Sequence, residues 1–310
     1  MPLSVIDPIS PAIERTKWVL FQPFDLGKWM RLGFCAFLMG LAQGGGGGGS
    51  FPGPGGGGPG GGQDGDRVAE FFREYLVIIV VVAIVVVLVF IAIGLALTWL
   101  GSRGQFMFLD GVVHNRAEVA APWREYRREA NSLFLFRVCL GIAVLLLIAA
   151  IAGVCTLIAW PDIQSRDFGS NAAVATVLGI GLLFAFVFSI LLISLFLTDF
   201  VVPIMYLRRI PVIAAWDAFY VEMLVGNKWL FARYVLMKFL ISWVVGFLAI
   251  AAMCLTCCLA MIPYVGSVIL LPLTVFGQAY PLYFIEQFGP EWRVFPVSGQ
   301  EATVGQAPRG

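Results

Sequence analysis

The chain has 310 residues, of which 60% are hydrophobic and only 13% are charged, whereas charged residues make up about a quarter of a soluble domain. Its formal charge of +1 gives no electrostatic reason to bind nucleic acid, which usually needs a clustered basic face. The composition predicts a membrane protein, and about six spanning helices with their loops would occupy the chain without leaving room for a soluble catalytic domain.

The N-terminal 31 residues are predicted to form a cytoplasmic segment at the membrane interface, followed by a first span near residues 26–43. The apolar run at residues 32–42 is short, and it reaches the length that a bilayer needs only if the helix begins near Leu26. A signal peptide is not expected, because Asp7, Glu14 and Asp25 interrupt this region and leave no compact apolar run.

Residues 44–62 contain 14 Gly and three Pro, a composition that favours a flexible linker. A phosphate-binding loop is not expected, because such a loop needs Lys and Ser or Thr after the last glycine and residues 63–66 read QDGD. The sequence therefore predicts an extracytoplasmic loop over residues 44–66.

Three long charge-free runs predict the next spans, near residues 75–102, 138–160 and 172–207. The run from Tyr75 to Ser102 has no charge over 28 residues, which is more than a helix needs to cross a bilayer. The second run ends at Trp160 and Pro161, an aromatic interface residue followed by a helix breaker.

A fourth charge-free run extends from Phe239 to Ile285 across 47 residues, which is enough for two spans. Pro263 and Gly266 mark the turn between them, so we expect spans near residues 236–260 and 263–285. The resulting prediction is a single transmembrane domain over residues 26–290, with residues 291–310 as a flexible cytoplasmic tail.

The predicted fold is an all-α transmembrane bundle of about six spans in three hairpins, each preceded by a cytoplasmic interfacial segment. Lys and Arg set its orientation, because 17 of the 20 fall in the N-terminal segment, the alternate loops and the tail. The positive-inside rule then places both termini in the cytoplasm. Similar sequences at the start of the hairpins are compatible with a parallel internal repeat or with the common requirements of membrane entry.

Metal-binding and catalytic motifs are poorly represented. Cys254 and Cys257 have the spacing of a CxxC motif, but all six cysteines lie inside predicted spans, where helix packing is the expected role. His114 is the only histidine, and we expect it to be solvated in a cytoplasmic loop. We therefore expect no metal, no cofactor and no enzymatic activity.

Ionisable and polar groups within the predicted spans form the candidate site, because such groups are costly in a membrane. Asp199 and Lys238 are predicted to lie at similar depths on antiparallel helices. The proposed intramembrane cluster comprises Asp199, Lys238, Arg233, Arg137, Arg103 and Gln278. Two interpretations remain open: a cytoplasm-facing site for an ion, a lipid headgroup or an anionic solute, and a carboxylate neutralised by Lys238 or Arg233.

Three motifs resemble those of an uncharacterised family of bacterial six-span membrane proteins: DFVVPIMY at 199–206, IPYVG at 262–266 followed by LLP at 270–272, and FIEQFGPE at 284–291. That family is distantly similar to the membrane-anchor domain of glycerophosphodiester phosphodiesterases. The resemblance implies a bacterial cytoplasmic membrane and assigns no site residue, and the chain lacks the soluble phosphodiesterase barrel.

Two classes of function follow. The first is a scaffold or accessory protein that contacts lipids and protein partners through cytoplasmic loops such as residues 123–128. The second is a transporter or permease for a small solute, ion or lipid that uses the Asp199 region. A hydrated cavity reaching Asp199 and Gln278 would favour transport, and a closed apolar interior would disfavour it. The residues do not indicate an oligomeric state.

Overall fold

The computed structural model describes residues 3–22, 24–42, 65–115, 119–165, 169–256 and 262–295. Every regular element in these ranges is helical, which confirms the prediction of an all-α protein. The predicted glycine-rich loop at 44–62, Cys257, Cys258 and the tail from residue 296 onward lie outside the described residues.

The helices vary widely in length. The N-terminal helices are α1 (Ile9–Phe21), α2 (Leu26–Ala42) and α3 (Gly65–His114). The central ones are α4 (Ala120–Glu125), α5 (Arg127–Ser165), α6 (Ser170–Phe196), the π-helical turn η1 (Leu197–Val201) and α7 (Val202–Arg208). The last are α8 (Val212–Ala218), the π-helical turn η2 (Phe219–Leu224), α9 (Lys228–Leu255), α10 (Pro263–Ile269), α11 (Leu271–Glu286) and the 3₁₀ turn η4 (Pro290–Trp292).

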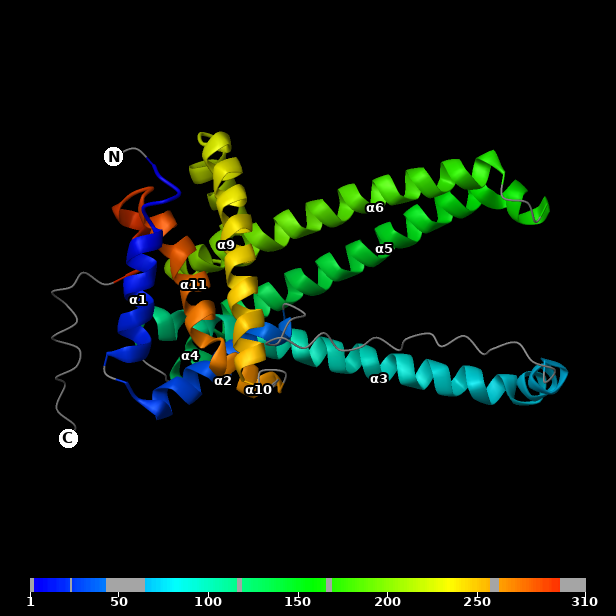
Figure 1. Ribbon diagram of the computed structural model, residues 1–310, viewed down its shortest axis with the longest axis horizontal. Helices are drawn as coiled ribbons and strands as arrows, with labels where there is room; N and C mark the ends of the chain where they lie inside the picture. Colours follow the sequence, from blue (N-terminus) through cyan, green and yellow to red (C-terminus); the bar gives the residue numbers. More distant parts are fainter. Residues whose placement is uncertain are drawn as a thin grey trace.

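The molecule consists of a body and two arms (Figure 1). One arm is the N-terminal part of α3, and the other is the hairpin formed by α5 and α6. The side chains of α3 change abruptly where the helix enters the body: those from Val80 to Phe90 are exposed, and those from Gly101 to Val113 are buried. Because the exposed part is almost wholly apolar, it suits a lipid environment rather than water.

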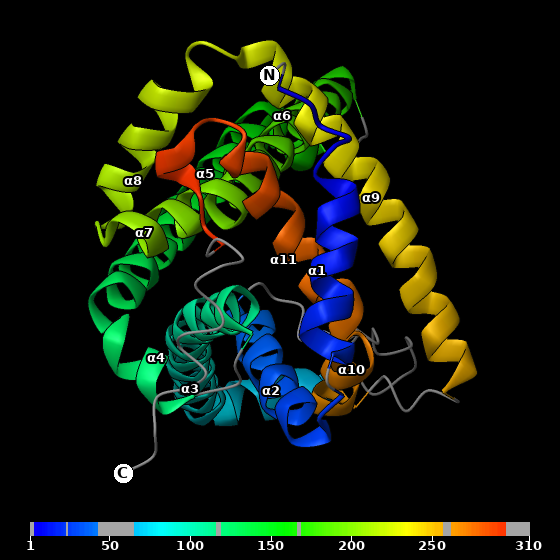
Figure 2. The same ribbon diagram turned by 90° about the vertical axis from the view of Figure 1, so that its left-hand side faces the viewer.

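Aromatic side chains fill the larger core of the body. Phe200 of η1 packs within 5.1 Å of the ring centroids of Phe219 and Phe231 and within 4.8 Å of that of Tyr234. Phe284 of α11 packs 5.9 Å from Phe200. These contacts join η1, η2, α9 and α11. In the end-on ribbon, α11 lies between α7 on one side and α9 on the other (Figure 2).

A second core joins α1 and α2 to the buried end of α3 and to α11. It includes Leu32, Cys35, Met107, Phe108 and Leu271. The backbones of α2 and α3 approach closely at Gly104, where an added Cβ would lie 2.5 Å from Leu38 Cβ. Glycine is therefore needed at this crossing.

Among the residues that the structure describes, four helical segments are long and apolar enough to cross a membrane: Val80–His114, Arg127–Asp162, Ser170–Arg208 and Lys228–Leu255. The predicted first span corresponds to α2, which has 17 residues and a partly buried surface. The predicted last span is divided at Leu270 into α10 and α11, and α11 is largely buried in the body. The six-span, three-hairpin arrangement therefore stays a prediction.

Helix α9 runs across the direction of α3, α5 and α6 rather than beside them, as both ribbon views show (Figures 1 and 2). Its first turns contribute Leu230, Phe231 and Tyr234 to the core. Farther along the helix, many apolar side chains are exposed, including Phe239, Trp243 and Phe247. This helix therefore borders the region where the two arms leave the body.

Candidate functional site

Asp199 lies in η1, a π-helical turn between α6 and α7 in which the Val202 N–H donates to the Leu197 carbonyl five residues earlier. Pro203 follows four residues later, and it has no N–H to donate to the Asp199 carbonyl, so the regular α-helical bond is lost. Single π-helical turns of this kind often occur at functional sites. The DFVVP motif therefore contains a residue, Pro203, that weakens the α-helix at Asp199.

The Asp199 carboxylate is buried and held by two donors from α9. The Tyr234 hydroxyl donates to Oδ2 at 2.9 Å, and Lys238 Nζ lies 3.1 Å from Oδ1 and 2.9 Å from Oδ2. Lys238 Nζ also donates to the Gly277 carbonyl of α11 at 3.3 Å. The carboxylate thus ties η1 to α9, and Lys238 extends this tie to α11.

A pocket of about 680 Å³ opens beside this pair at the base of the arms. Its polar lining includes Asp199, Lys238, Arg137, Gln278, Thr98, Ser194, Thr198, Ser242 and Thr274, and its apolar lining includes Met39, Leu140, Val144, Ile190, Leu195 and Leu197. The structure therefore brings together four of the six residues of the predicted cluster: Asp199, Lys238, Arg137 and Gln278.

The other two members of the predicted cluster lie elsewhere. Arg233 is on an exposed face of α9 and does not line the pocket. Arg103 is buried between Trp99 and Trp123, with its guanidinium carbon 4.3 and 4.8 Å from the two ring centroids, and it donates to Asn131 at 3.3 Å. Its role in the described structure is to connect α3 to α4 and α5.

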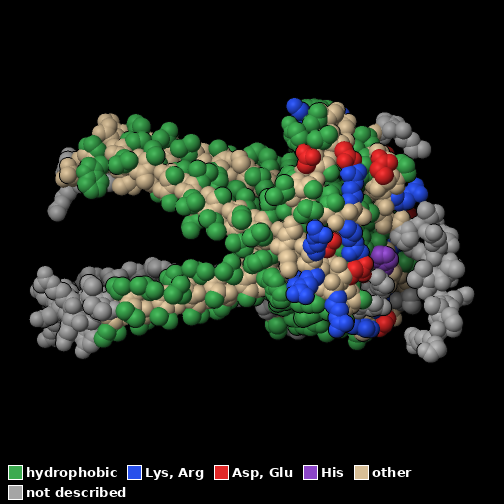
Figure 3. Space-filling view, turned by 180° about the vertical axis from the view of Figure 1, so that it is seen from behind, with side chains coloured by type: hydrophobic (Ala, Val, Ile, Leu, Met, Phe, Trp, Pro, Cys, Tyr) green, Lys and Arg blue, Asp and Glu red, His purple; other side chains and the backbone are tan. Residues whose placement is uncertain are grey.

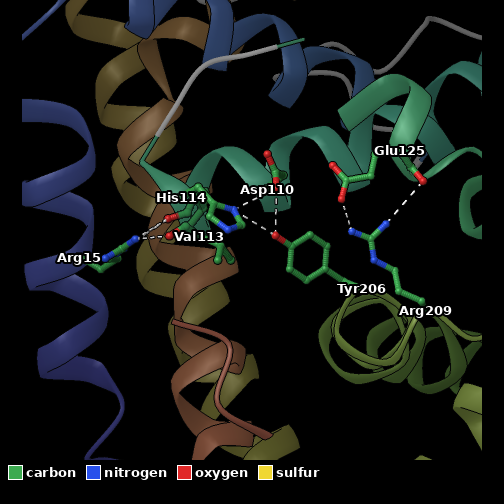
Figure 4. A network of polar contacts seen from close by, with 8 residues as sticks. Arg15, Asp110, Val113, His114, Glu125, Tyr206 and Arg209 are labelled. Atoms are coloured by element: carbon green, nitrogen blue, oxygen red, sulfur yellow. Dashed lines mark hydrogen bonds and ion pairs between the residues drawn. The ribbon is translucent and has the colours of Figure 1, made fainter. Parts of the chain in front are cut away.

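A second polar network lies at the C-terminal end of α3 and includes His114, whose side chain is 43% exposed, in agreement with the expectation that it is solvated. His114 belongs to the last turn of α3 rather than to a loop, and its Nδ1 lies 3.0 Å from Asp110 Oδ1. Tyr206 of α7 donates to the same carboxylate at 3.0 Å, and its hydroxyl also lies 3.3 Å from His114 Nδ1, so the three side chains are in mutual contact (Figure 4). The spacing of Asp110 and His114 by four residues on a helix was the signal for this contact.

The same network fastens neighbouring helices to the end of α3 and to α7. Arg15 of α1 donates to the carbonyl oxygens of Val112 and Val113 (Figure 4), which a regular helix leaves without partners at its C-terminus. Arg209 pairs with Glu125 and stacks 3.8 Å from the Tyr126 ring centroid. Burial raises the pKa of the Tyr126 hydroxyl, so this group stays neutral and serves packing.

No cluster of three or more His, Cys, Asp or Glu side chains that could hold a metal ion occurs in the described ranges. Cys139 and Cys254 are exposed on α5 and α9, whereas Cys35 is buried in the second core. The polar centre of the described structure is therefore the pocket beside Asp199.

One family model matches residues 3–293, a range that includes both the body and the arms. The chain belongs to a family of unknown function, DUF7544. No curated protein and no solved structure matches the chain. Membership of DUF7544 supplies no activity or ligand, and the similarity to the anchor domain of glycerophosphodiester phosphodiesterases stays a prediction.

Proposed function

We propose that the protein is a multi-pass scaffold or accessory protein of a bacterial cytoplasmic membrane, that it acts from its cytoplasmic face, and that it is not an enzyme. The observation that carries this proposal is the separation of charged from apolar surface. Lys, Arg, Asp and Glu side chains gather on the body, whereas the arms present hydrophobic side chains (Figure 3). The apolar arms are suited to contact with lipid, and the charged body is suited to contact with water. A protein partner is therefore expected to bind the body.

The distribution of Lys and Arg supports a cytoplasmic position for the body. Among the described basic residues at 103–137 and 208–238, all but Arg209 belong to helices that build the body or enter it, and an excess of such residues marks the cytoplasmic side. The N-terminal segment and the end of α11 also meet there, because Ser4 and Gln287 exchange hydrogen bonds of 2.8 and 2.9 Å. A topology reporter inserted between residues 44 and 62 is expected to be extracytoplasmic; a cytoplasmic reporter would overturn this orientation.

The start of α5 and the preceding α4 offer the most distinctive charged surface for a partner. Arg124, Arg127 and Arg128 are exposed around the buried Tyr126. Long basic side chains of this kind dock acidic protein surfaces and, at the membrane edge, lipid headgroups. This surface requires no opening of the structure.

The test compares native purifications of two charge-matched variants. Arg124→Gln/Arg127→Gln/Arg128→Gln removes the proposed surface, and Lys17→Gln/Lys228→Gln/Arg233→Gln removes three exposed positive charges elsewhere. We expect a defined set of proteins to co-purify with the wild type and the second variant and to be lost with the first. Equal recovery with both variants, at equal abundance in the membrane, would contradict the proposal.

A second candidate function is transport of a small solute, ion or lipid, and the pocket is the observation that favours it. Its lining includes both Asp199 and Gln278, the two residues expected to face a cavity in a transporter. The test is flux into proteoliposomes under an imposed proton or sodium gradient. Flux that Asp199→Asn abolishes and Arg233→Gln leaves unchanged would favour transport over the scaffold role.

A further inference from the structure

Arg137 is a half-buried cation without a carboxylate partner. Its guanidinium donates to Ser102 Oγ at 3.1 Å and to Gln105 Oε1, and both of these acceptors are neutral. None of the ion pairs between described residues includes Arg137. An unbalanced charge at the edge of a membrane is energetically unfavourable unless an anion lies close to it. Arg137 therefore favours the binding of a negatively charged group in the pocket.

Gln278 adds a second unused donor. The side chain is 5% exposed, lines the same pocket, and its Nε2 has no hydrogen-bond partner among the described residues. A buried amide donor without a partner is destabilising, and native structures usually satisfy it. Because Asp199 is already balanced by Lys238, the pocket keeps one net positive charge together with this free donor.

The lining that the α5–α6 arm contributes is apolar at its outer end. On α5 it passes from Arg137 at the body to Leu140 and Val144 farther out, and on α6 it passes from Leu195 and Ser194 to Ile190. Thr98 and Met39 complete it on the side of α3 and α2. A ligand bound in this pocket would therefore contact hydrogen-bond donors at its inner end and apolar side chains at its outer end.

The pocket has room for a ligand at the depth of a lipid headgroup. Gly141 and Gly277 both line it, and an added Cβ at either position would meet nothing within 4 Å. From Arg137 to its end at Ser165, α5 is about 42 Å long at about 1.5 Å per residue, close to the full thickness of a bilayer with its headgroups. With the tip of the α5–α6 arm at one surface of the bilayer, Arg137 lies at the opposite surface.

We propose that this pocket binds the phosphodiester headgroup of an anionic phospholipid, with the acyl chains lying between the diverging arms that Figure 3 shows. Arg137 supplies the positive charge, and Gln278 Nε2 donates to a phosphate or glycerol oxygen. The inference goes beyond the scaffold role, because it assigns a ligand to a site that docking of a protein partner does not require.

The test is native mass spectrometry of detergent-purified protein incubated with equal amounts of dioleoyl phosphatidylglycerol and dioleoyl phosphatidylcholine. We expect phosphatidylglycerol to be retained about tenfold more than phosphatidylcholine, because both lipids carry the phosphodiester but the choline cation of phosphatidylcholine cancels the negative charge that would balance Arg137. Gln278→Leu removes the amide donor, and Arg137→Gln removes the positive charge. Gly141→Leu fills the pocket and leaves both the donor and the charge in place. Each change is expected to lower phosphatidylglycerol retention about tenfold.

Arg233→Gln is the matched control, because it removes an exposed positive charge from α9 outside the pocket, and it is expected to retain lipid as the wild type does. Equal retention of the two lipids by the wild type, or unchanged retention in both Gln278→Leu and Gly141→Leu, would overturn the proposal. Displacement of phosphatidylglycerol by inorganic phosphate would overturn the lipid assignment in favour of a free phosphate. Gly141→Leu keeps every polar group of the pocket, so it separates blocked binding from misfolding of the donor variants.

Discussion

Asp199 forms a buried ion pair with Lys238, in which the two side chains lie 2.9 Å apart with only 7% and 17% of their surfaces exposed. Removing one partner of a buried pair leaves the other charge unbalanced and costs about 3–5 kcal/mol. We therefore expect Lys238→Met to lower the Tm of the detergent-purified protein strongly. Asp199→Asn/Lys238→Met is expected to recover most of that loss, because Tyr234 can still donate to the amide oxygen.

The four proteins of this double-mutant cycle are compared by thermal unfolding in one detergent. A double variant as unstable as Lys238→Met would show that the two charges do not compensate each other. Arg233→Met serves as the control, because its side chain is exposed on the same helix and its loss leaves no buried charge.

Glu222 and Arg208 offer a pH-dependent contact on the body. The two hydrogen bonds from Arg208, both 2.6 Å long, hold the pKa of Glu222 below its ordinary value of 4.5. A carboxylate with a lowered folded-state pKa stabilises the protein above the unfolded pKa, and this contribution disappears as the pH falls through the folded-state pKa. The side chains are 33% and 40% exposed, so the contribution at neutral pH is small, about 0.5 kcal/mol.

We expect Glu222→Gln to lower the Tm slightly at neutral pH and to match the wild type in acid below the folded-state pKa. Thermal unfolding of the two proteins across this pH range is the measurement. Asp217→Asn is the control, since Asp217 is exposed on the neighbouring α8 and belongs to none of the ion pairs between described residues. A Glu222→Gln difference that persists in acid would show that the effect does not come from ionisation.

At the scale of the elements, the crossing of α2 and α3 depends on Gly104. An added Cβ would lie 2.5 Å from Leu38 Cβ and 2.7 Å from the backbone nitrogen of Met39, so the two helices would have to separate. We expect Gly104→Ala to destabilise the protein by about 1–3 kcal/mol through overpacking. Gly94→Ala is the control in the same helix, because nothing lies within 4 Å of its added Cβ and alanine favours helix by about 0.5–1 kcal/mol.

Thermal unfolding of the two alanine variants is therefore expected to move in opposite directions. If Gly104→Ala and Gly94→Ala were equally stable, the close approach of α2 to α3 would not contribute to the packing of the body. The comparison separates helix propensity from interhelical contact, since both residues belong to α3.

The elements that the sequence predicts best are those set by local composition. The runs at 138–160 and 172–207 lie within α5 and within α6 to α7, because a charge-free stretch of that length has few alternatives to helix in a membrane protein. The run at 263–285 is different: Tyr280 and Phe284 are apolar in sequence, yet they are buried in the aromatic core. Apolar composition cannot distinguish a lipid-facing helix from a helix packed inside protein.

The sequence predicted at which depth in the membrane the candidate-site residues lie, but only partly on which side of its helix each residue lies. Asp199 and Lys238 were placed at one level by counting residues, and the structure places them in contact. Arg233 was assigned to the same cluster, but it precedes Lys238 by five residues, which turns its side chain by about 140° around α9. Tyr234 precedes Lys238 by four residues and therefore lies on the same face of α9. This helical spacing was the sequence signal for Tyr234 as the second donor to Asp199.

At the scale of the whole molecule, the direction of α9 decides how the protein sits in a bilayer. The exposed apolar stretch of α3 from Val80 to Leu100 is about 30 Å long at about 1.5 Å per residue, which matches the hydrocarbon core. Since α9 runs across this direction (Figures 1 and 2), an orientation in which the arms cross the bilayer lays α9 along its surface. Its exposed Trp229 and Trp243 are residues favoured at such an interface.

Spin labels test this arrangement in a variant whose six native cysteines are replaced by alanine. Labels at Val87, Leu146 and Phe184, all exposed on the arms, are expected to show high oxygen and low nickel accessibility, as in the bilayer centre. A label at Val244, near the middle of α9, is expected at interfacial depth, and one at Arg128 in water. If Val244 were as deep as Val87, α9 would cross the bilayer beside the arms and would have to turn relative to the body. Such a turn would carry Lys238 away from Asp199, so the depth of Val244 and the stability of the Asp199–Lys238 pair must agree.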